Sequence, residues 1–131
     1  EITKNKFKKS KYNNDIEYIN DGHEKIDKYI SEKVDGIIYN LGYLPGSEHN
    51  IKTEKDTTIK SLEKAVDIID DNGLIVIVIY TEHEGGELEK EAILDYTTNL
   101  DYKTFNVMHY HFINQKKNPP EVVVIKKRRD K

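Results

Sequence analysis

Apolar runs alternate with amphipathic stretches along most of this chain. Gly36–Tyr39 is a short apolar run that ends at Asn40, which indicates a buried strand. Leu74–Tyr80 is an unbroken apolar or aromatic run, typical of a central parallel strand that is covered on both faces. Between the two runs, apolar residues at helical spacing predict an amphipathic helix; they are Ile59, Leu62, Val66 and Ile69.

The limits of this helix can also be predicted. Thr53–Asp56 resembles a capping box with Asp in place of Glu, so the helix is expected to start near Glu54 after a long polar loop. Asn72-Gly73 is expected to stop it. A later helix is predicted from residues at helical spacing, namely Leu88, Ala92 and Tyr96.

The remaining segments complete an alternating order. Further strands are predicted at Ile16–Ile19, Thr104–Phe112 and Val122–Ile125, with a loop at Asn114–Pro120. A short helix is predicted from Ile26, Tyr29 and Ile30, and Glu1–Tyr12 is predicted to be the charged end of a helix. This order indicates an α/β open sheet, and the last two strands, which no helix joins, indicate an antiparallel pair at one edge.

Composition narrows the class of protein. The chain has 131 residues, enough for one domain or part of one, with 36% hydrophobic and 34% charged residues. The net charge of −3 does not mark the whole chain as a nucleic-acid binder, although its start and its end, Lys126–Arg129, are basic. The absence of Cys excludes disulfides and thiolate metal sites. We find no signal peptide and no long apolar run, which predicts a cytoplasmic protein without membrane contact.

Two polar loops follow the predicted buried strands. Asn40–Gly46 comes after the first strand, and Thr81–Gly86 comes after the second. In open α/β sheets, ligands bind at the carboxyl ends of the strands. We therefore expect the two loops to meet in one ligand-binding cleft.

Four segments in the same order resemble one family. They are Asp21–Glu24, Asn40–Gly46, His83–Gly86 and Phe112–Gln115 with Asn118–Pro120. Together they are similar to the class I S-adenosylmethionine-dependent methyltransferases long labelled "putative rRNA methylase". That family includes bacterial enzymes that methylate 5-aminomethyl-2-thiouridine at the wobble position of tRNA.

The resemblance implies a Rossmann-like class I methyltransferase sheet of strand order 3-2-1-4-5-7-6, with S-adenosylmethionine as cofactor and the tRNA anticodon region as partner. The loop that holds the methionine end of the cofactor and the acid that holds its ribose are not found in this chain. We therefore expect residues 1–131 to be the C-terminal two-thirds of a single domain without its first two strands, with an exposed apolar face and no normal cofactor binding alone. A homodimer through the edge strand pair is a further expectation.

The resemblance also implies cofactor-binding residues. Those after the first predicted strand are Asp21, Gly22 and His23, and those of the next loop are Asn40, Leu41 and Gly42. A carboxylate can accept a hydrogen bond from the adenine amino group, and Gly lets the backbone approach. The structural alternative for Asp21–His23 is an Asp-Gly turn that caps a helix.

For the reaction, the implied catalytic residues are Asn40, Tyr43 and His83. Asn40 and the Leu41 carbonyl would orient the amine, Tyr43 would stack on the base, and His83 would take a proton. Substrate-binding residues would be Tyr43, Leu44, Pro45, Gly46, Tyr80, His83, Gly85, Gly86, Asn114 and Gln115. Leu41-Gly42 replaces the Pro-Pro pair of related amino-methyltransferases, so we expect a different loop geometry. The alternatives are a core Tyr43 and a helix-capping loop with a surface His83.

Other readings remain open. His109 and His111 share a strand face, but two imidazoles without a third ligand favour half-buried strand histidines over zinc, and no metal is predicted. The basic tail is either a solvated end or a contact to tRNA phosphates. Three alternatives to the tRNA enzyme are an rRNA base methyltransferase, a non-catalytic nucleic-acid-binding domain derived from a methyltransferase, and a small-molecule methyltransferase.

Overall fold

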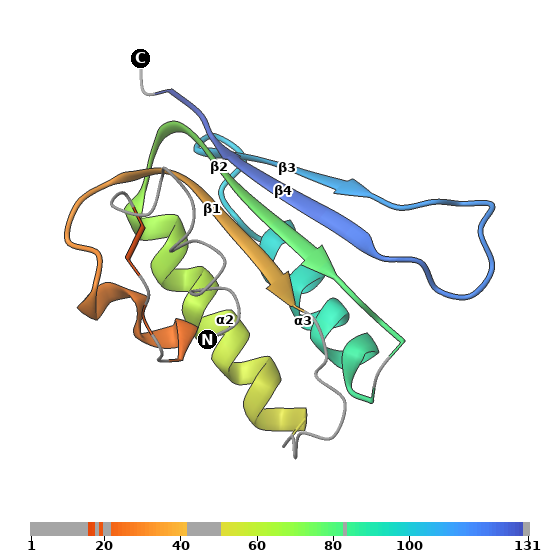
Figure 1. Cartoon of the computed structure of the whole chain (residues 1–131). Coiled ribbons are helices and arrows are strands. Elements are labelled where there is room, and N and C mark those ends of the chain that lie inside the picture. The colour runs from red at the N-terminus through yellow and green to blue at the C-terminus, as the bar shows by residue number, and fades with distance from the viewer. Residues whose placement is uncertain (1–15, 18, 20–21, 42–50, 83, 130–131) are drawn as a thin grey trace.

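The computed structural model describes residues 16–17, 19, 22–41, 51–82 and 84–129 (Figure 1). Within these ranges, a short 3-10 helix is followed by strands and α-helices in alternation. The elements are η2 (His23–Lys28), β1 (Val34–Leu41), α2 (Ile51–Ile68), β2 (Ile69–Ile79), α3 (Gly86–Thr98), β3 (Phe105–Tyr110) and β4 (Glu121–Lys127). No helix in the described ranges has both the length and the apolar character needed to cross a membrane.

The described strands form one sheet of order β1-β2-β4-β3. β1 and β2 are parallel, and β4 is antiparallel to both of its neighbours, β2 and β3. The α/β class and the antiparallel pair at one edge are therefore confirmed. The order also matches the last four positions, 4-5-7-6, of the sheet that the family resemblance implies.

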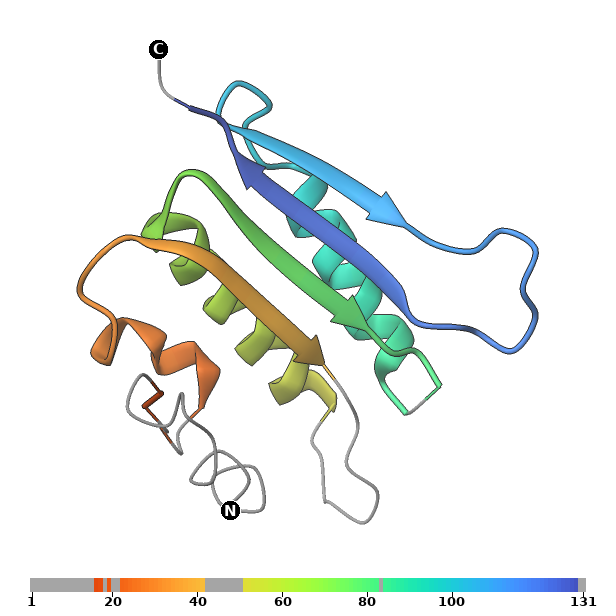
Figure 2. The same ribbon diagram turned by 45° about the horizontal axis from the view of Figure 1, so that its top comes forward.

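Helices α2 and α3 lie together on one face of the sheet (Figure 2). Alternate residues of β2 point toward them, and Ile75, Ile77 and Ile79 are fully buried there. Leu62 of α2 and Ile93 of α3 are buried against this row. Each such side chain contributes about 1.5–3 kcal/mol through removal from water, so this layer is the core of the described fold.

The opposite face of the sheet carries no described helix, which corrects the expectation that β2 is covered on both sides (Figure 2). The register places Ile38, Val76, Val124 and Met108 side by side in one row across the four strands. Ile38 is 76% exposed and Met108 43% exposed. We call this surface the bare face, and its apolar row confirms the expected exposed apolar surface.

The predicted limits of the helix that corresponds to α2 were wrong. α2 begins at Ile51, so Thr53 lies inside the helix rather than at its cap. It ends at Ile68, and Ile69 begins β2, where it pairs with Val34. The register jumps beyond this pair, and Asn72 has a φ of 64°. The Asn72-Gly73 turn signal therefore marks an irregularity within β2 instead of a helix stop.

The strand predicted at Ile16–Ile19 was also wrong. Ile16, Glu17 and Ile19 have no strand assignment, and β1 is the edge strand of the described sheet. A strand needs a neighbour that satisfies its backbone N–H and C=O groups, and the described residues provide none at that place. The helix end predicted over Glu1–Tyr12 lies outside the described residues.

Candidate functional site

Three strands of the sheet have their carboxyl ends on the same side of the sheet, which we call the reaction edge. β1 and β2 are parallel, and Asn40 pairs with Val78 while Leu41 pairs with Ile79. β3 runs in the same direction as β2, because β4 is antiparallel to both. β1 and β2 therefore end next to each other, and β3 ends on the same side of the sheet, beyond β4 (Figure 2). Five of the residues predicted for the site lie at the ends of β1 and β2 or at the start of α3, namely Asn40, Leu41, Tyr80, Gly85 and Gly86. Asn114 and Gln115 lie on the connection that follows β3, at the other edge strand of the sheet.

Asn40 is exposed at the end of β1. Strand side chains alternate between faces, so Asn40 lies on the bare face, whereas its neighbour Tyr39 is only 6% exposed on the helix side. The polar group at this position is open to solvent. It can therefore reach a molecule bound at the edge of the sheet.

The two glycines before and at the start of α3 are required by the backbone itself. Gly85 has a φ of 84°, a left-handed conformation that glycine adopts without strain. A Cβ on Gly86 would lie 2.9 Å from both the Thr81 Cα and the Tyr80 carbonyl oxygen. The helix therefore starts in tight contact with the end of β2. The helix-capping alternative thus has direct structural support, while a substrate role for these glycines stays a prediction.

Gly22 and His23 lie beside α2, on the side of β1 away from Asn40. The His23 ring meets the Tyr39 ring edge-on at 5.8 Å, and the Ser61 hydroxyl donates to the His23 carbonyl at 3.0 Å. Burial lowers the pKa of His23 below its usual value, and the nearby Glu24 only partly opposes this change. Lys64 anchors η2 further by donating to the Glu24 carbonyl and pairing with Asp27 at 2.9 Å. The structure therefore does not place the His23 and Asn40 side chains on one face.

Several predicted site residues lie outside the described residues, and their roles stay predictions. They are Asp21, Gly42, Tyr43, Leu44, Pro45, Gly46 and His83.

An ion-pair cluster at the base of the β3–β4 connection was missed in the sequence. Glu121 is 8% exposed; its carboxylate lies 2.6 Å from the Lys90 Nζ and 2.7 Å from the His109 Nε2. Burial opposes its ionisation, but the hydrogen bonds from Lys90 and His109 outweigh burial and hold the pKa of Glu121 below its usual value. The hydrogen bond to Glu121 correspondingly raises the pKa of Lys90. His109 also stacks on His111, with ring centroids 4.9 Å apart.

A second buried carboxylate lies between the two helices. Glu89, in the first turn of α3, is 8% exposed and accepts a hydrogen bond from the Thr58 hydroxyl of α2 at 3.2 Å. An acidic residue at a helix N-terminus is favourable for the helix dipole, and that sequence signal could have drawn attention to it. The pair ties α2 to the beginning of α3, close to the edge that gathers the predicted site.

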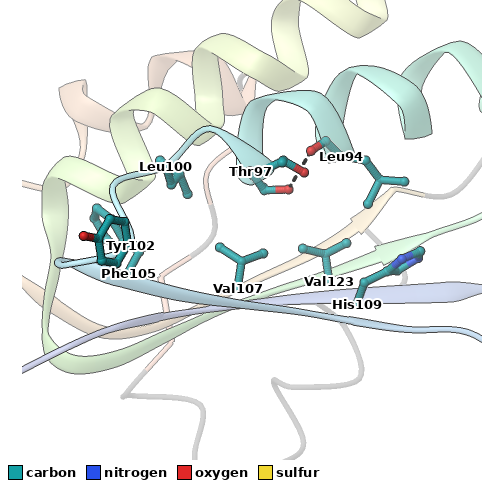
Figure 3. Close-up of a pocket in the computed structure, with 9 residues that line it drawn as sticks. Leu94, Thr97, Leu100, Tyr102, Phe105, Val107, His109 and Val123 are labelled. Atoms are coloured by element: carbon teal, nitrogen blue, oxygen red, sulfur yellow. Dashed lines mark hydrogen bonds between the residues drawn. The ribbon is translucent and has the colours of Figure 1, made fainter.

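A cavity of about 450 Å³ lies elsewhere, between the C-terminal half of α3 and the β3–β4 pair (Figure 3). It is lined by Leu94, Thr97, Thr98, Leu100, Tyr102, Phe105, Val107, His109 and Val123. The Thr97 hydroxyl donates to the Ile93 carbonyl at 2.8 Å, and His109 is bound to Glu121. The Thr97 hydroxyl and the His109 ring are thus already engaged, and none of the predicted site residues lines this cavity.

Comparison with known proteins identifies the family of this chain. Residues 1–126 match the protein family described as "Putative rRNA methylase". A curated relative from Arabidopsis thaliana, named tRNA (mnm(5)s(2)U34)-methyltransferase, chloroplastic, is 32% identical over 107 residues, which are 80% of this chain and 39% of that protein. The chain therefore spans well under half the length of this relative.

Solved structures show the same relationship. A crystal structure described as a putative rRNA-methylase from Clostridium thermocellum has a TM-score of 0.76 at 43% identity, and covers 83% of this chain and 59% of its own. A putative methyltransferase from Streptococcus mutans, solved in complex with SAH, has a TM-score of 0.73 at 37% identity, with 82% and 58% covered. The chain spans somewhat less than two-thirds of each.

Proposed function

The chain belongs to the putative rRNA methylase family, and from that premise we propose that it is part of an S-adenosylmethionine-dependent N-methyltransferase that acts on the 5-aminomethyl group of a wobble uridine in tRNA. The name of the Arabidopsis relative supports this substrate. The SAH in the Streptococcus mutans relative, which is what the cofactor becomes after methyl transfer, supports the cofactor.

One observation carries the proposal for this chain. The ends of β1 and β2 are adjacent, and Asn40 is exposed there in register with Val78. In open α/β sheets, this edge is where ligands bind. The described residues at this place fit part of the cofactor, S-adenosylmethionine. They offer the exposed amide of Asn40, the backbone of Leu41 and the start of α3, which packs tightly against the end of β2. In this proposal, the methionine and ribose ends of the cofactor are held by segments other than these described residues.

In this proposal, residues of the chain position the amine. S-adenosylmethionine supplies an electrophilic methyl group when it is bound. The Asn40 side-chain oxygen and the Leu41 carbonyl accept hydrogen bonds from the amine and direct its lone pair, while Tyr43 stacks on the base and His83 takes the released proton. Orientation of this kind can lower a barrier by about 7–11 kcal/mol, and no covalent enzyme intermediate is needed.

We also propose that residues 1–131 form the C-terminal two-thirds of a single methyltransferase domain. Support comes from the strand order, which equals the last four positions of the family sheet, and from the partial coverage of the solved relatives. The exposed apolar row of the bare face adds a physical reason, because sheets with parallel strands are normally covered on both faces.

The test replaces Asn40 in the full-length protein. Asn40→Ala is expected to lower methyl transfer to tRNA roughly 100-fold through loss of amine orientation, with little change in the unfolding midpoint. Asn106→Ala, an exposed Asn at the opposite end of the same face, is the matched control. Mass spectrometry of nucleosides from tRNA and rRNA measures the product.

The outcomes separate the candidate functions. Methylated uridine in tRNA that depends on Asn40 supports the proposal, whereas a methylated base found only in rRNA contradicts it and favours the rRNA enzyme. If calorimetry detects no S-adenosylmethionine binding by the full-length protein, the enzyme proposal fails and the non-catalytic RNA-binding domain is favoured instead.

A further inference from the structure

The connection between β3 and β4 projects beyond the sheet as an arm of residues 111–120 (Figures 1 and 2). It leaves the sheet on the same side as Asn40 and the start of α3, because β3 runs in the same direction as β1 and β2, although β2 and β4 lie between β1 and β3. Every residue of the arm except the half-buried Pro119 is exposed. The arm therefore extends the proposed substrate edge outward from the body of the molecule.

The arm combines apolar and cationic side chains in the open. Phe112 is 64% exposed and Ile113 is 89% exposed, while Lys116 and Lys117 follow on the same connection. The arm contains no acidic residue. An exposed aromatic ring beside two cations is the combination with which proteins bind single-stranded nucleic acid, through base stacking and phosphate contacts.

Charge is distributed unevenly between this hairpin and the rest of the chain. From Tyr102 to Arg129 the sequence has seven Lys or Arg side chains and a single acid, Glu121, although the whole chain carries a net charge of −3. Glu121 is engaged by Lys90 and His109. Of these cations, Lys116 and Lys117 lie on the arm, whereas Lys126–Arg129 lie at the opposite end of β4. The hairpin thus carries positive charge that complements a polyanion, in a chain whose other residues have a net negative charge.

Ion pairs fix the arm where it leaves the sheet, and two residues near its tip have a left-handed backbone conformation. Glu121 and His109, one on each strand, are joined at 2.7 Å where the arm leaves the sheet, and Lys90 links the pair to α3 at 2.6 Å. Lys117 and Asn118 have positive φ values of 75° and 46°. An arm that is fixed in this way loses less conformational freedom when it binds than an unconstrained loop would.

We propose that the arm docks an RNA loop, with Phe112 stacked on an unpaired base and Lys116 and Lys117 bound to phosphates. This inference rests on the proposed function and adds to it the surface that holds the RNA next to the reaction edge. A stacked base and two neighbouring phosphates select an unpaired loop over a regular duplex, because only unpaired bases expose a free ring face.

The experiment measures binding of the full-length protein to a fluorescently labelled RNA hairpin with an anticodon loop, by anisotropy over a range of salt concentrations. Phe112→Ala is expected to weaken binding about 5- to 150-fold, the loss of one stacked base, and Phe112→Tyr to retain it. Lys116→Ala/Lys117→Ala is expected to reduce the slope of log affinity against log salt by about 1.4, or 0.7 for each phosphate contact on a single strand. Lys28→Ala/Lys60→Ala removes the same charge from exposed positions on η2 and α2, and is expected to leave that slope nearly unchanged.

The outcomes distinguish failure of the arm proposal from failure of the proposed function. If all arm variants bind the hairpin like the unaltered protein while Asn40→Ala still lowers methyl transfer, the arm proposal is overturned and the proposed function stands. If the unaltered protein binds no RNA, both fail. If light scattering shows that Phe112→Ala dissociates a dimer while RNA affinity is unchanged, the arm is an interface between copies, which overturns the RNA proposal. Calorimetry with S-adenosylmethionine checks that the arm variants keep the cofactor site.

Discussion

At the scale of single residues, the glycines at the start of α3 show how a motif residue can be required by the fold. Gly85 and Gly86 were predicted to contact substrate, but the backbone alone accounts for both, through the left-handed φ of Gly85 and the contact of Gly86 with the end of β2. The sequence reveals the pair but not the reason. The reason depends on how closely α3 approaches Thr81, and that packing is not encoded in any local pattern.

Replacing Gly86 by Ala tests this explanation. The added Cβ would lie 2.9 Å from backbone atoms, so α3 or β2 has to shift, and we expect a loss of about 1–3 kcal/mol in the free energy of unfolding. Urea unfolding measures it. Gly36→Ala is the control, because its Cβ would meet nothing closer than the Leu74 carbonyl oxygen at 3.8 Å. Equal stability of the two variants would show that Gly86 is not needed for packing.

At the scale of elements, strongly periodic or uniformly apolar segments were predictable, and the joins between elements were not. β2, α3 and β4 follow from apolar runs or helical spacing. Ile69 was assigned to the helix because a buried Ile suits a helix stripe and a strand face equally well, and its pairing with Val34 decides between them. The Glu121 cluster was missed because its three members come from α3, β3 and β4, far apart in sequence.

The Glu121 cluster makes stability depend on pH. The pKa of Glu121 is lowered on folding, so its contribution is fully present above the unfolded value of about 4.3 and is lost as pH falls through the lower folded value. Glu121→Gln is therefore expected to cost about 1–3 kcal/mol at neutral pH. The difference from the unaltered protein should shrink below about pH 4.

Urea unfolding between pH 3 and 7 measures this difference. The exposed Glu82→Gln variant is the control, because no ion pair of Glu82 is seen in the described part of the chain. The other carboxylates are common to all three proteins, so the comparison isolates Glu121. A stability difference that stays constant down to pH 3 would contradict the assignment of the lowered pKa to this cluster.

At the scale of the whole molecule, α2 and α3 cover one face of the sheet, and the bare face has no described helix on it. The family, the strand order of the sheet and the exposed apolar surface were predictable, since four motifs in order and a pattern of buried strands carry that information. The open row of Ile38, Val76, Val124 and Met108 has the composition of an interior surface. If the proposed remainder of the domain covers it, the same side chain should behave differently in residues 1–131 alone and in the full-length protein.

Ile38→Lys tests this difference directly. Ile38 is 76% exposed, so in residues 1–131 alone the change should alter the free energy of unfolding by less than about 0.5 kcal/mol. In the full-length protein, the new charge would be buried without a partner and should cost about 3–5 kcal/mol. Tyr102→Lys, at a side chain that is 75% exposed outside this row, should be neutral in both. A neutral Ile38→Lys in the full-length protein would mean that the row stays in water there, and the bare face would then need another explanation, because a solvated apolar row of this length lowers solubility without stabilising the fold.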